Sequence, residues 1–240
     1  MLLNGLLAPA QGHTREIHCT ASDGHPLTAT IDTPDAGKNI HAGVILLPMY
    51  NANRADWKPL TRALTAAGFT CLALDLRGHG DSRFAADGSD DGARVLQRDP
   101  TLFTAMYQDV AAADQWLRDN KPELTKLALI GASVGCSVAV HAITSKAVKA
   151  DAAVLMTPGK NYLGVPTMVH IRQWPDIPLL ILSSEEEKER GAVALYQAVK
   201  NKEAVLKLFP QTSIHGTNML DNVPGVEAFI SDWLTKIMRP

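Results

Sequence analysis

One short segment of the chain combines a nucleophilic side chain with the backbone freedom that would expose it. Gly131-Ala-Ser-Val-Gly135 stands between an apolar, strand-like run (126–130) and a helix-like run of small residues (136–143). In the pattern G-x-S-x-G, a serine on a tight turn between strand and helix presents its hydroxyl, and the glycines tolerate the strained backbone. The N–H of Val134 would then lie at a helix N-terminus, where it can meet a developing negative charge. This segment predicts Ser133 as a nucleophile.

A serine hydroxyl needs a base within hydrogen-bond distance, and position separates the eight histidines of the chain. His215 follows the last strand-like run (206–209) by a short loop, and Gly216 lets that loop bend over the edge of the sheet. In proteins with the G-x-S-x-G pattern, the nucleophile, the acid and the histidine follow one another along the chain in that order, and a histidine at position 215 fits it. We therefore expect His215 to be the base.

A serine and a histidine of this kind usually act with a third residue, an acid, as a catalytic triad. The acid holds the imidazole in the required tautomer and stabilises the imidazolium. It should follow the strand-like run 179–182, where the sequence reads Ser183-Ser-Glu-Glu-Glu-Lys-Glu189. A charge run of this kind is usually the solvated start of a helix, but one glutamate can point inward. The distance past the strand favours Glu187, with Glu186 as the alternative.

The elements that must position these residues alternate along the chain. Strands alternating with helices predict an α/β fold: a doubly wound, mostly parallel sheet of about eight strands with helices on both faces. Active sites of such sheets lie at the carboxyl ends of the strands. We expect a flexible N-terminus over 1–14 and a single domain over 15–240. The expected strands are 15–20, 27–33, 42–47, 69–75, 126–130, 152–156, 179–182 and 204–209, and the expected helices are 55–67, 101–120, 136–143, 191–200 and 226–238.

Composition excludes several classes of partner. The 240 residues suffice for one α/β domain, and 23 basic against 25 acidic side chains give a net charge of −2, which favours neither nucleic acid nor a membrane surface. The most apolar stretch, 127–140, is shorter than the roughly 20 residues that cross a bilayer. The three cysteines are widely spaced, so we expect no disulfide framework, no metal site and no cofactor.

The N-terminus permits two interpretations of where the protein resides. Residues 1–10 end in Ala8-x-Ala10, which is similar to a signal-peptidase site, but they lack a basic region and a sufficiently long apolar run. We therefore expect a cytoplasmic protein, with a trimmed secretory leader as the alternative.

A second motif points to a family. Asp75-Leu-Arg-Gly-His-Gly-Asp-Ser82 resembles the D-x-R-G-x-G-x-S loop of many α/β-hydrolases, and together with the serine motif it makes nearly the whole chain similar to that superfamily. The resemblance implies a structural role for this loop, in which Asp75 and Arg77 anchor a turn. The chain also resembles the compact, lidless dienelactone-hydrolase-like and carboxylesterase-like groups, although the former carry a cysteine nucleophile. Only 157–178 is available for a lid, so no large cap domain is expected.

Two departures from the family pattern concern the site. Where the family usually has His-Gly at the start of the oxyanion loop, this chain has Pro48-Met49-Tyr50, and proline has no N–H to donate. The expected oxyanion donors are Val134 and Tyr50, with Met49 as the alternative to Tyr50. The other departure is a glutamate in place of the commoner aspartate in the triad.

The resulting expectation is a serine hydrolase of the carboxylesterase type, acting on small or medium esters through an acyl-enzyme intermediate. The residues expected to line its substrate pocket are Met49, Tyr162 and Leu163, with Trp174 as a further candidate. Thioester, lactone or amide hydrolysis would use the same residues. The alternative class is a non-catalytic α/β-hydrolase-fold protein that binds a small ligand or a protein. The sequence leaves the oligomeric state open.

Overall fold

The computed structural model describes residues 12–239 of the chain. The leader-like pattern at Ala8 and Ala10, and most of the expected flexible segment 1–14, therefore lie outside the described residues.

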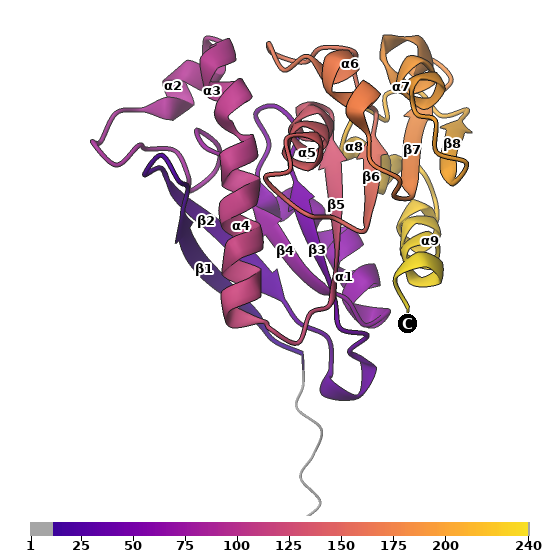
Figure 1. Ribbon diagram of the computed structural model, residues 1–240, viewed down its shortest axis with the longest axis horizontal. Coiled ribbons are helices and arrows are strands. Elements are labelled where there is room, and N and C mark those ends of the chain that lie inside the picture. Colours follow the sequence, from indigo (N-terminus) through magenta and orange to yellow (C-terminus); the bar gives the residue numbers. More distant parts are fainter. Residues whose placement is uncertain (1–11, 240) are drawn as a thin grey trace, which may run out of the picture.

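The centre of the molecule is one sheet of eight strands in the order β1-β2-β4-β3-β5-β6-β7-β8 (Figure 1). β1 and β2 pair antiparallel, β2 pairs antiparallel with β4, and every pairing from β4 to β8 is parallel. The predicted mostly parallel, doubly wound sheet is thus confirmed. The strands are β1 (Thr14–Thr20), β2 (Pro26–Asp32), β3 (Ala42–Leu47), β4 (Thr70–Leu74), β5 (Lys126–Ala132), β6 (Ala152–Met156), β7 (Leu179–Ser184) and β8 (Ala204–Phe209).

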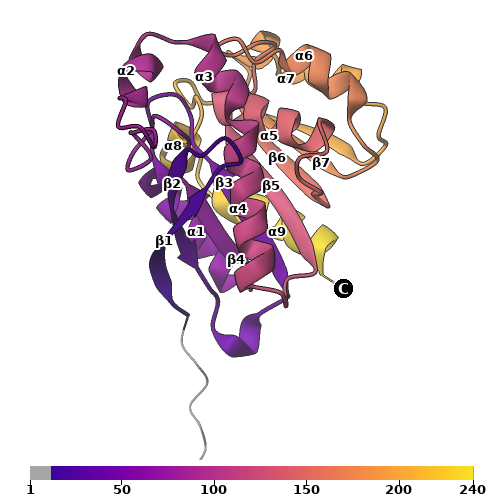
Figure 2. The ribbon, with the colours of Figure 1, turned by 60° about the vertical axis from the view of Figure 1, so that its left-hand side comes forward.

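Helices cover both faces of this sheet, and each face has its own apolar core. Along β3, Val44 and Leu46 pack in the core beneath α1 and α9, whereas Ile45 and Leu47 pack in the core beneath α4 and α5. Figure 2 shows α4 on one side of the sheet and α9 on the other. The α-helices are α1 (Lys58–Ala66), α2 (Asp91–Leu96), α3 (Pro100–Ala105), α4 (Tyr107–Asn120), α5 (Val134–Thr144), α6 (Thr167–His170), α7 (Ala192–Ala198), α8 (Asn218–Asn222) and α9 (Val226–Met238).

The structure differs from the sequence expectation mainly in the helices. The single helix expected over 101–120 is two helices, α3 and α4, which meet at Met106. The new start places Asp109 in the first turn of α4, fully buried, where its carboxylate accepts hydrogen bonds from Arg77. The short helices α2, α6 and α8 were not predicted. For α2 the signal was Asp90, whose side chain caps the helix by accepting from the Ala93 N–H.

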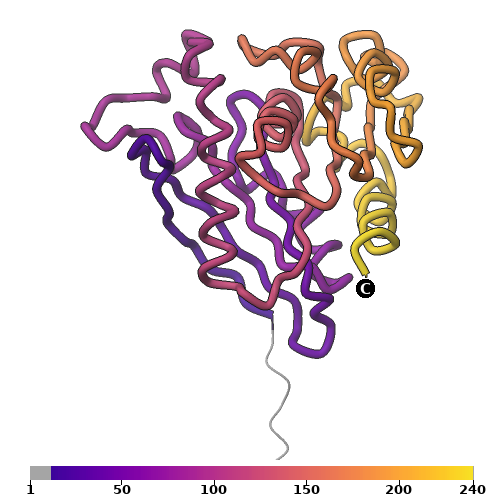
Figure 3. Tube along the Cα trace, in the orientation of Figure 1, coloured from indigo at the N-terminus to yellow at the C-terminus, as the bar shows by residue number. Residues whose placement is uncertain are grey.

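The loops that follow the parallel strands emerge at one end of the sheet, the upper end in Figure 3. The segments that carry Tyr50, Ser133, Tyr162, Glu187 and His215 belong to this set, following β3, β5, β6, β7 and β8. Within residues 12–239, no helix combines the length and apolar character needed to cross a membrane. The same residues contain no group of three or more His, Cys, Asp or Glu side chains that could hold a metal ion.

Two histidines join α6 to the helix that follows the serine motif. The rings of His141 in α5 and His170 in α6 are stacked, with centroids 4.2 Å apart, and Tyr107 of α4 lies 4.4 Å from the His141 ring. Burial, together with the neighbouring His170, lowers the pKa of His141 from 6.5 to about 4. Burial also lowers the pKa of His170. The stack therefore requires neutral imidazoles.

This stack gives the fold a pH dependence of known sign. Above pH ~6.5 His141 is neutral in the folded and unfolded chain, and between pH ~6.5 and 4 only the unfolded chain takes up the proton. Stability is therefore lost as the pH falls through this window, and His141→Phe should reduce that loss. Urea denaturation at intervals from pH 7.5 to 4 measures the free energy of unfolding across this window. His18→Phe, which changes an exposed histidine, is the control. An unchanged pH profile in His141→Phe would contradict the interpretation.

Candidate active site

Ser133 follows β5 in a backbone conformation that few residues adopt. Its φ and ψ angles are 51° and −114°, a combination that persists only where the surroundings hold it. A Cβ atom on Gly131 would lie 2.3 Å from the carbonyl oxygen of Gly135, and one on Gly135 would lie 2.3 Å from that of Leu47. Both positions require glycine, because α5 begins in contact with the ends of β5 and β3.

Two short hydrogen bonds join the three residues that the sequence proposed as a triad. Ser133 Oγ lies 2.7 Å from His215 Nε2, and Glu187 Oε2 lies 2.7 Å from His215 Nδ1. Because a carboxylate only accepts, the Nδ1 atom carries the proton and Nε2 is free to accept from the serine hydroxyl. The structure thus brings together side chains from the loops that follow β5, β7 and β8.

Glu187 is held both at its carboxylate and at its backbone. Arg190 Nη1 lies 2.8 Å from Glu187 Oε1, and the Glu187 N–H donates to Ser184 Oγ over 3.0 Å. The Glu187 side chain is 11% exposed, whereas Glu186 is exposed to solvent. Arg190 and Ser184 were not predicted, although each lies three residues from Glu187, the spacing at which side chains in a helical turn meet.

The loop that carries His215 is fixed by a residue that the sequence analysis also missed. Thr157, directly after β6, accepts a hydrogen bond from the Gly216 N–H at its Oγ1 atom over 2.7 Å. A Cβ atom on Gly216 would lie 2.4 Å from the sulfur of Met49. The imidazole is therefore positioned by contacts with the loops after β6 and β3. The only sequence signal for Thr157 was its place at a strand end.

The backbone N–H groups expected to bind an oxyanion belong to the start of α5 and to the loop after β3. Among residues 12–239, the N–H group of Val134, at the start of α5, has no hydrogen-bond partner, and neither do those of Tyr50 and its alternative Met49, in the loop after β3. The loop turns at Asn51, which has a φ of 57°, and Ala52 donates back to the Met49 carbonyl over 3.2 Å. The loop that carries Tyr50 follows β3, the strand that lies next to β5 in the sheet.

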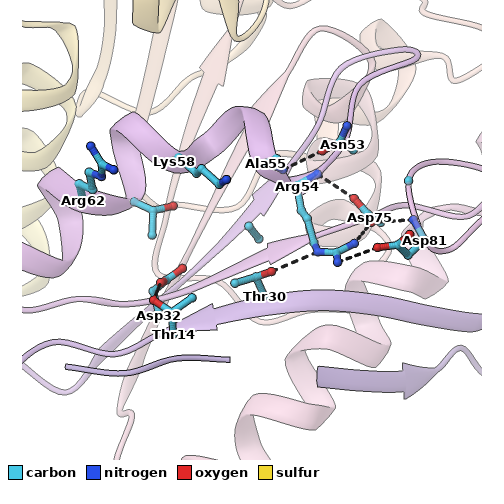
Figure 4. A pocket seen from close by; sticks show the side chains of 13 residues that line it. Thr14, Thr30, Asp32, Asn53, Arg54, Ala55, Lys58, Arg62, Asp75 and Asp81 are labelled. Carbon is cyan, nitrogen blue, oxygen red and sulfur yellow. Dashed lines mark hydrogen bonds and ion pairs between the residues drawn. The ribbon is translucent and has the colours of Figure 1, made fainter. Parts of the chain in front are cut away.

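Asp75, at the end of β4, anchors the loop that carries Tyr50. Its fully buried carboxylate accepts from the backbone N–H of Arg54 over 2.7 Å and from that of Asp81 over 2.9 Å. The Arg54 guanidinium pairs with the same carboxylate and donates to Thr30 over 3.1 Å (Figure 4). Arg54 lies four residues after Tyr50, so a buried charge ties this loop to the sheet.

Arg77 anchors the rest of the D-x-R-G-x-G-x-S loop through different partners. Its guanidinium donates to the buried carboxylate of Asp109 over 2.6 and 2.8 Å, and to Asp23 over 2.6 Å. Asp75 and Arg77 therefore each stabilise this loop, but not by pairing with each other. His79 is buried within it, with Nδ1 3.0 Å from the Arg77 carbonyl, and burial lowers the pKa of its imidazole.

A cavity of about 640 Å³ lies beside the Arg54 network, between α1 and the strands β2 and β4. Figure 4 shows Lys58 and Arg62 along its helical wall and Asp32 on its opposite side. None of its lining residues belongs to the Ser133, His215 and Glu187 group. The cavity is therefore separate from the chemistry described above.

Of the residues expected to line a substrate pocket, some lie near the triad and one lies at the opposite end of the sheet. Met49 packs beside Gly216, and the ring of Tyr162 stands edge-on to His215, with centroids 6.1 Å apart. Leu163 is half-buried against the core, with a φ of 53°. The indole N–H of Trp174 donates to the Ile177 carbonyl at the amino end of β7, the end opposite the triad. The idea that Trp174 forms a pocket wall was therefore wrong.

The thiol of Cys136, one turn into α5, does not compete with Ser133. Its sulfur lies 3.0 Å from the carbonyl oxygen of Gly131 and 3.2 Å from that of Met156. Burial raises the pKa of this thiol well above its ordinary value, and the thiolate is the nucleophilic form of cysteine.

Residues 38–174, more than half of the chain, match the family model described as serine aminopeptidase, S33. The chain belongs to this family of α/β-hydrolases, which confirms the resemblance seen in its motifs. A search among curated proteins gave no match.

Solved structures with the same fold cover nearly the whole chain. An esterase from an Arctic intertidal metagenomic library is 20% identical over 99% of both chains, with a TM-score of 0.74. An esterase of Pyrococcus furiosus is 17% identical over 98% of both, with a TM-score of 0.73. A lidless α/β serine hydrolase of Xanthomonas campestris is 19% identical over 96% of both, with a TM-score of 0.68. At these identities the likeness establishes a shared fold without a large cap.

The approach of α5 to β3 can be tested at Gly135. Gly135→Ala should lower the free energy of unfolding by about 1–3 kcal/mol, because the added methyl group overlaps the Leu47 carbonyl. Gly37→Ala is the matched control, since no atom lies within 4 Å of a Cβ atom at that position. Chemical denaturation of both variants measures the difference, and a Gly135→Ala protein as stable as the control would contradict the contact.

Proposed function

We propose that the protein is a serine hydrolase that cleaves carboxylic esters of small or medium size through an acyl-enzyme intermediate. The observation that carries this proposal is the pair of 2.7 Å hydrogen bonds that links Ser133 Oγ, His215 and Glu187. An uncharged serine hydroxyl attacks an ester slowly, and a histidine in this position removes its proton as the attack proceeds.

Acylation begins when Ser133 Oγ attacks the ester carbonyl and His215 Nε2 takes the hydroxyl proton. The negative charge then moves to the carbonyl oxygen, which the N–H groups of Val134 and Tyr50 stabilise. Glu187 holds the imidazole by its Nδ1–H and stabilises the imidazolium. When the intermediate collapses, His215 returns the proton to the departing alcohol and the acyl group stays on Ser133.

Deacylation repeats these steps with water as the nucleophile. His215 takes a proton from the water, the same N–H groups stabilise the second oxyanion, and the acid leaves with Ser133 restored. Water must reach the acyl-enzyme, and the short segment between β6 and β7 leaves no large cap over the site. This open site favours compact esters, with Met49, Tyr162 and Leu163 as the proposed contacts for the substrate.

Related acyl substrates share this machinery, and the family description names an aminopeptidase. Thioesters, lactones and amides all pass through a tetrahedral intermediate that the same residues can stabilise. Esters are the first choice because their alcohol needs less protonation on departure than an amine does.

The first test is hydrolysis of p-nitrophenyl esters from acetate to decanoate, beside Ser133→Ala. We expect turnover of the shorter esters and a loss of at least about 10³-fold in kcat for the variant, because the nucleophile is removed. An amino-acyl p-nitroanilide in the same assay separates esterase from aminopeptidase activity. Activity that survives in Ser133→Ala would overturn the assignment of the nucleophile.

The two glutamates after β7 provide a matched test of the acid. Glu187→Gln should lower kcat on the order of 10³-fold, since the amide no longer stabilises the imidazolium. Glu186→Gln introduces the same chemical change on an exposed side chain and should retain wild-type kcat. Equal losses in the two variants would contradict the role of Glu187.

The alternative function is ligand or protein binding without catalysis. A fluorophosphonate probe forms a covalent bond only with an activated serine, so labelling of wild-type protein and not of Ser133→Ala or His215→Ala supports the hydrolase. A folded wild-type protein that resists labelling and hydrolyses none of the esters would favour the binding alternative.

A further inference from the structure

The order of strands divides the surroundings of Ser133 into two sides. β5, which leads to Ser133, lies between β3 and β6. The loop after β3 carries Tyr50, whereas the segment after β6 carries Tyr162. Since neighbouring parallel strands deliver their loops in the same order, Tyr162 stands on the side opposite Tyr50, one of the proposed oxyanion donors. His215, which protonates the departing alcohol, lies on the side of Tyr162.

The Tyr162 side chain is held over the triad by its own segment. Its ring stands edge-on to the His215 imidazole at an interplanar angle of 89°. A Cβ atom on Gly159 would lie 2.5 Å from the ring carbon that bears the hydroxyl, so only glycine leaves room for the ring. The Val165 N–H donates to the Tyr162 carbonyl over 2.9 Å and closes the turn. The ring has little freedom to move away.

The hydroxyl of Tyr162 is available as a hydrogen-bond donor at the site. The acceptor recorded for it is the Thr157 carbonyl, 3.4 Å away, which is the long end of the range for a hydroxyl donor. Burial, with smaller contributions from the neighbouring Cys136 and Glu187, raises the pKa of Tyr162 to about 12. The phenol therefore stays protonated at neutral pH, on a ring that packs edge-on against the His215 imidazole of the triad.

We propose that the Tyr162 hydroxyl donates a hydrogen bond to the leaving-group oxygen of the substrate, as a catalytic residue of the acylation step. This proposal rests on the serine hydrolase function proposed above. As the tetrahedral intermediate collapses, the bond between the carbonyl carbon and the alcohol oxygen breaks and its electron pair moves to that oxygen. The proton that neutralises the oxygen comes from His215 Nε2, while Tyr162 keeps its own proton and stabilises the developing charge.

This role points to a class of substrate. A p-nitrophenolate leaves readily because its charge is spread over the ring, whereas an aliphatic alkoxide concentrates charge on one oxygen and needs stabilisation. A donor dedicated to the leaving group therefore benefits esters of aliphatic alcohols most. We infer that such esters, rather than aryl esters, are the substrates to which this site is adapted.

The test compares wild type with Tyr162→Phe on two esters of one acid, ethyl butyrate and p-nitrophenyl butyrate. The value of kcat/KM reports on acylation for both, since they form the same acyl-enzyme. Loss of one hydrogen bond to a developing charge should lower kcat/KM about tenfold or more for the ethyl ester and little for the aryl ester. Tyr196→Phe, on an exposed tyrosine, is the matched control.

The outcomes separate the two proposals. A larger loss for the ethyl ester supports the leaving-group role, and across a series of alcohols the loss should grow with the pKa of the alcohol. Equal losses for both esters would mean that Tyr162 only positions His215, and no loss for either would mean that its hydroxyl is not used; both overturn the proposal. A wild-type protein that hydrolyses neither ester and resists a fluorophosphonate would instead overturn the serine hydrolase function itself.

Discussion

The close approach of α5 to the ends of β5 and β3 is the constraint on which the arrangement around Ser133 depends. A single methyl group on Gly131 or Gly135 would collide with a backbone carbonyl oxygen. This packing holds Ser133 at a positive φ, and it keeps the first N–H groups of α5 next to the serine hydroxyl. A single contact between a helix and two strands therefore fixes Ser133 and the backbone N–H groups beside it.

Buried charges fix the loops around that contact. Asp75 ties the loop after β3 to the sheet through Arg54, and Asp109 ties the loop after β4 to α4 through Arg77. Each carboxylate is fully buried, and a buried charge without its partner costs several kcal/mol. Such pairs restrain a loop more strongly than surface contacts do, which suits residues that must hold their position relative to Ser133.

The fold was predictable from the sequence because the signals that define it are local. The apolar runs and the glycines between them mark the strands and turns, and their alternation with helical periodicity implies a parallel sheet. The break at Met106 was not predictable, since 101–120 has continuous helical periodicity. The break places Asp109 in the first turn of α4, where it pairs with Arg77, a partner 32 residues away in the chain.

At the site, the sequence by itself determined the chemical types and their order: a serine on a strained turn, an acidic cluster after a later strand, and a histidine beside a glycine after the last. Which glutamate faces His215, and that Thr157 and Arg190 hold the pair in place, were decided by the tertiary structure. The physical reason is that residue spacing specifies the strand end from which a side chain emerges. The direction it takes depends on packing and charged partners from distant parts of the chain.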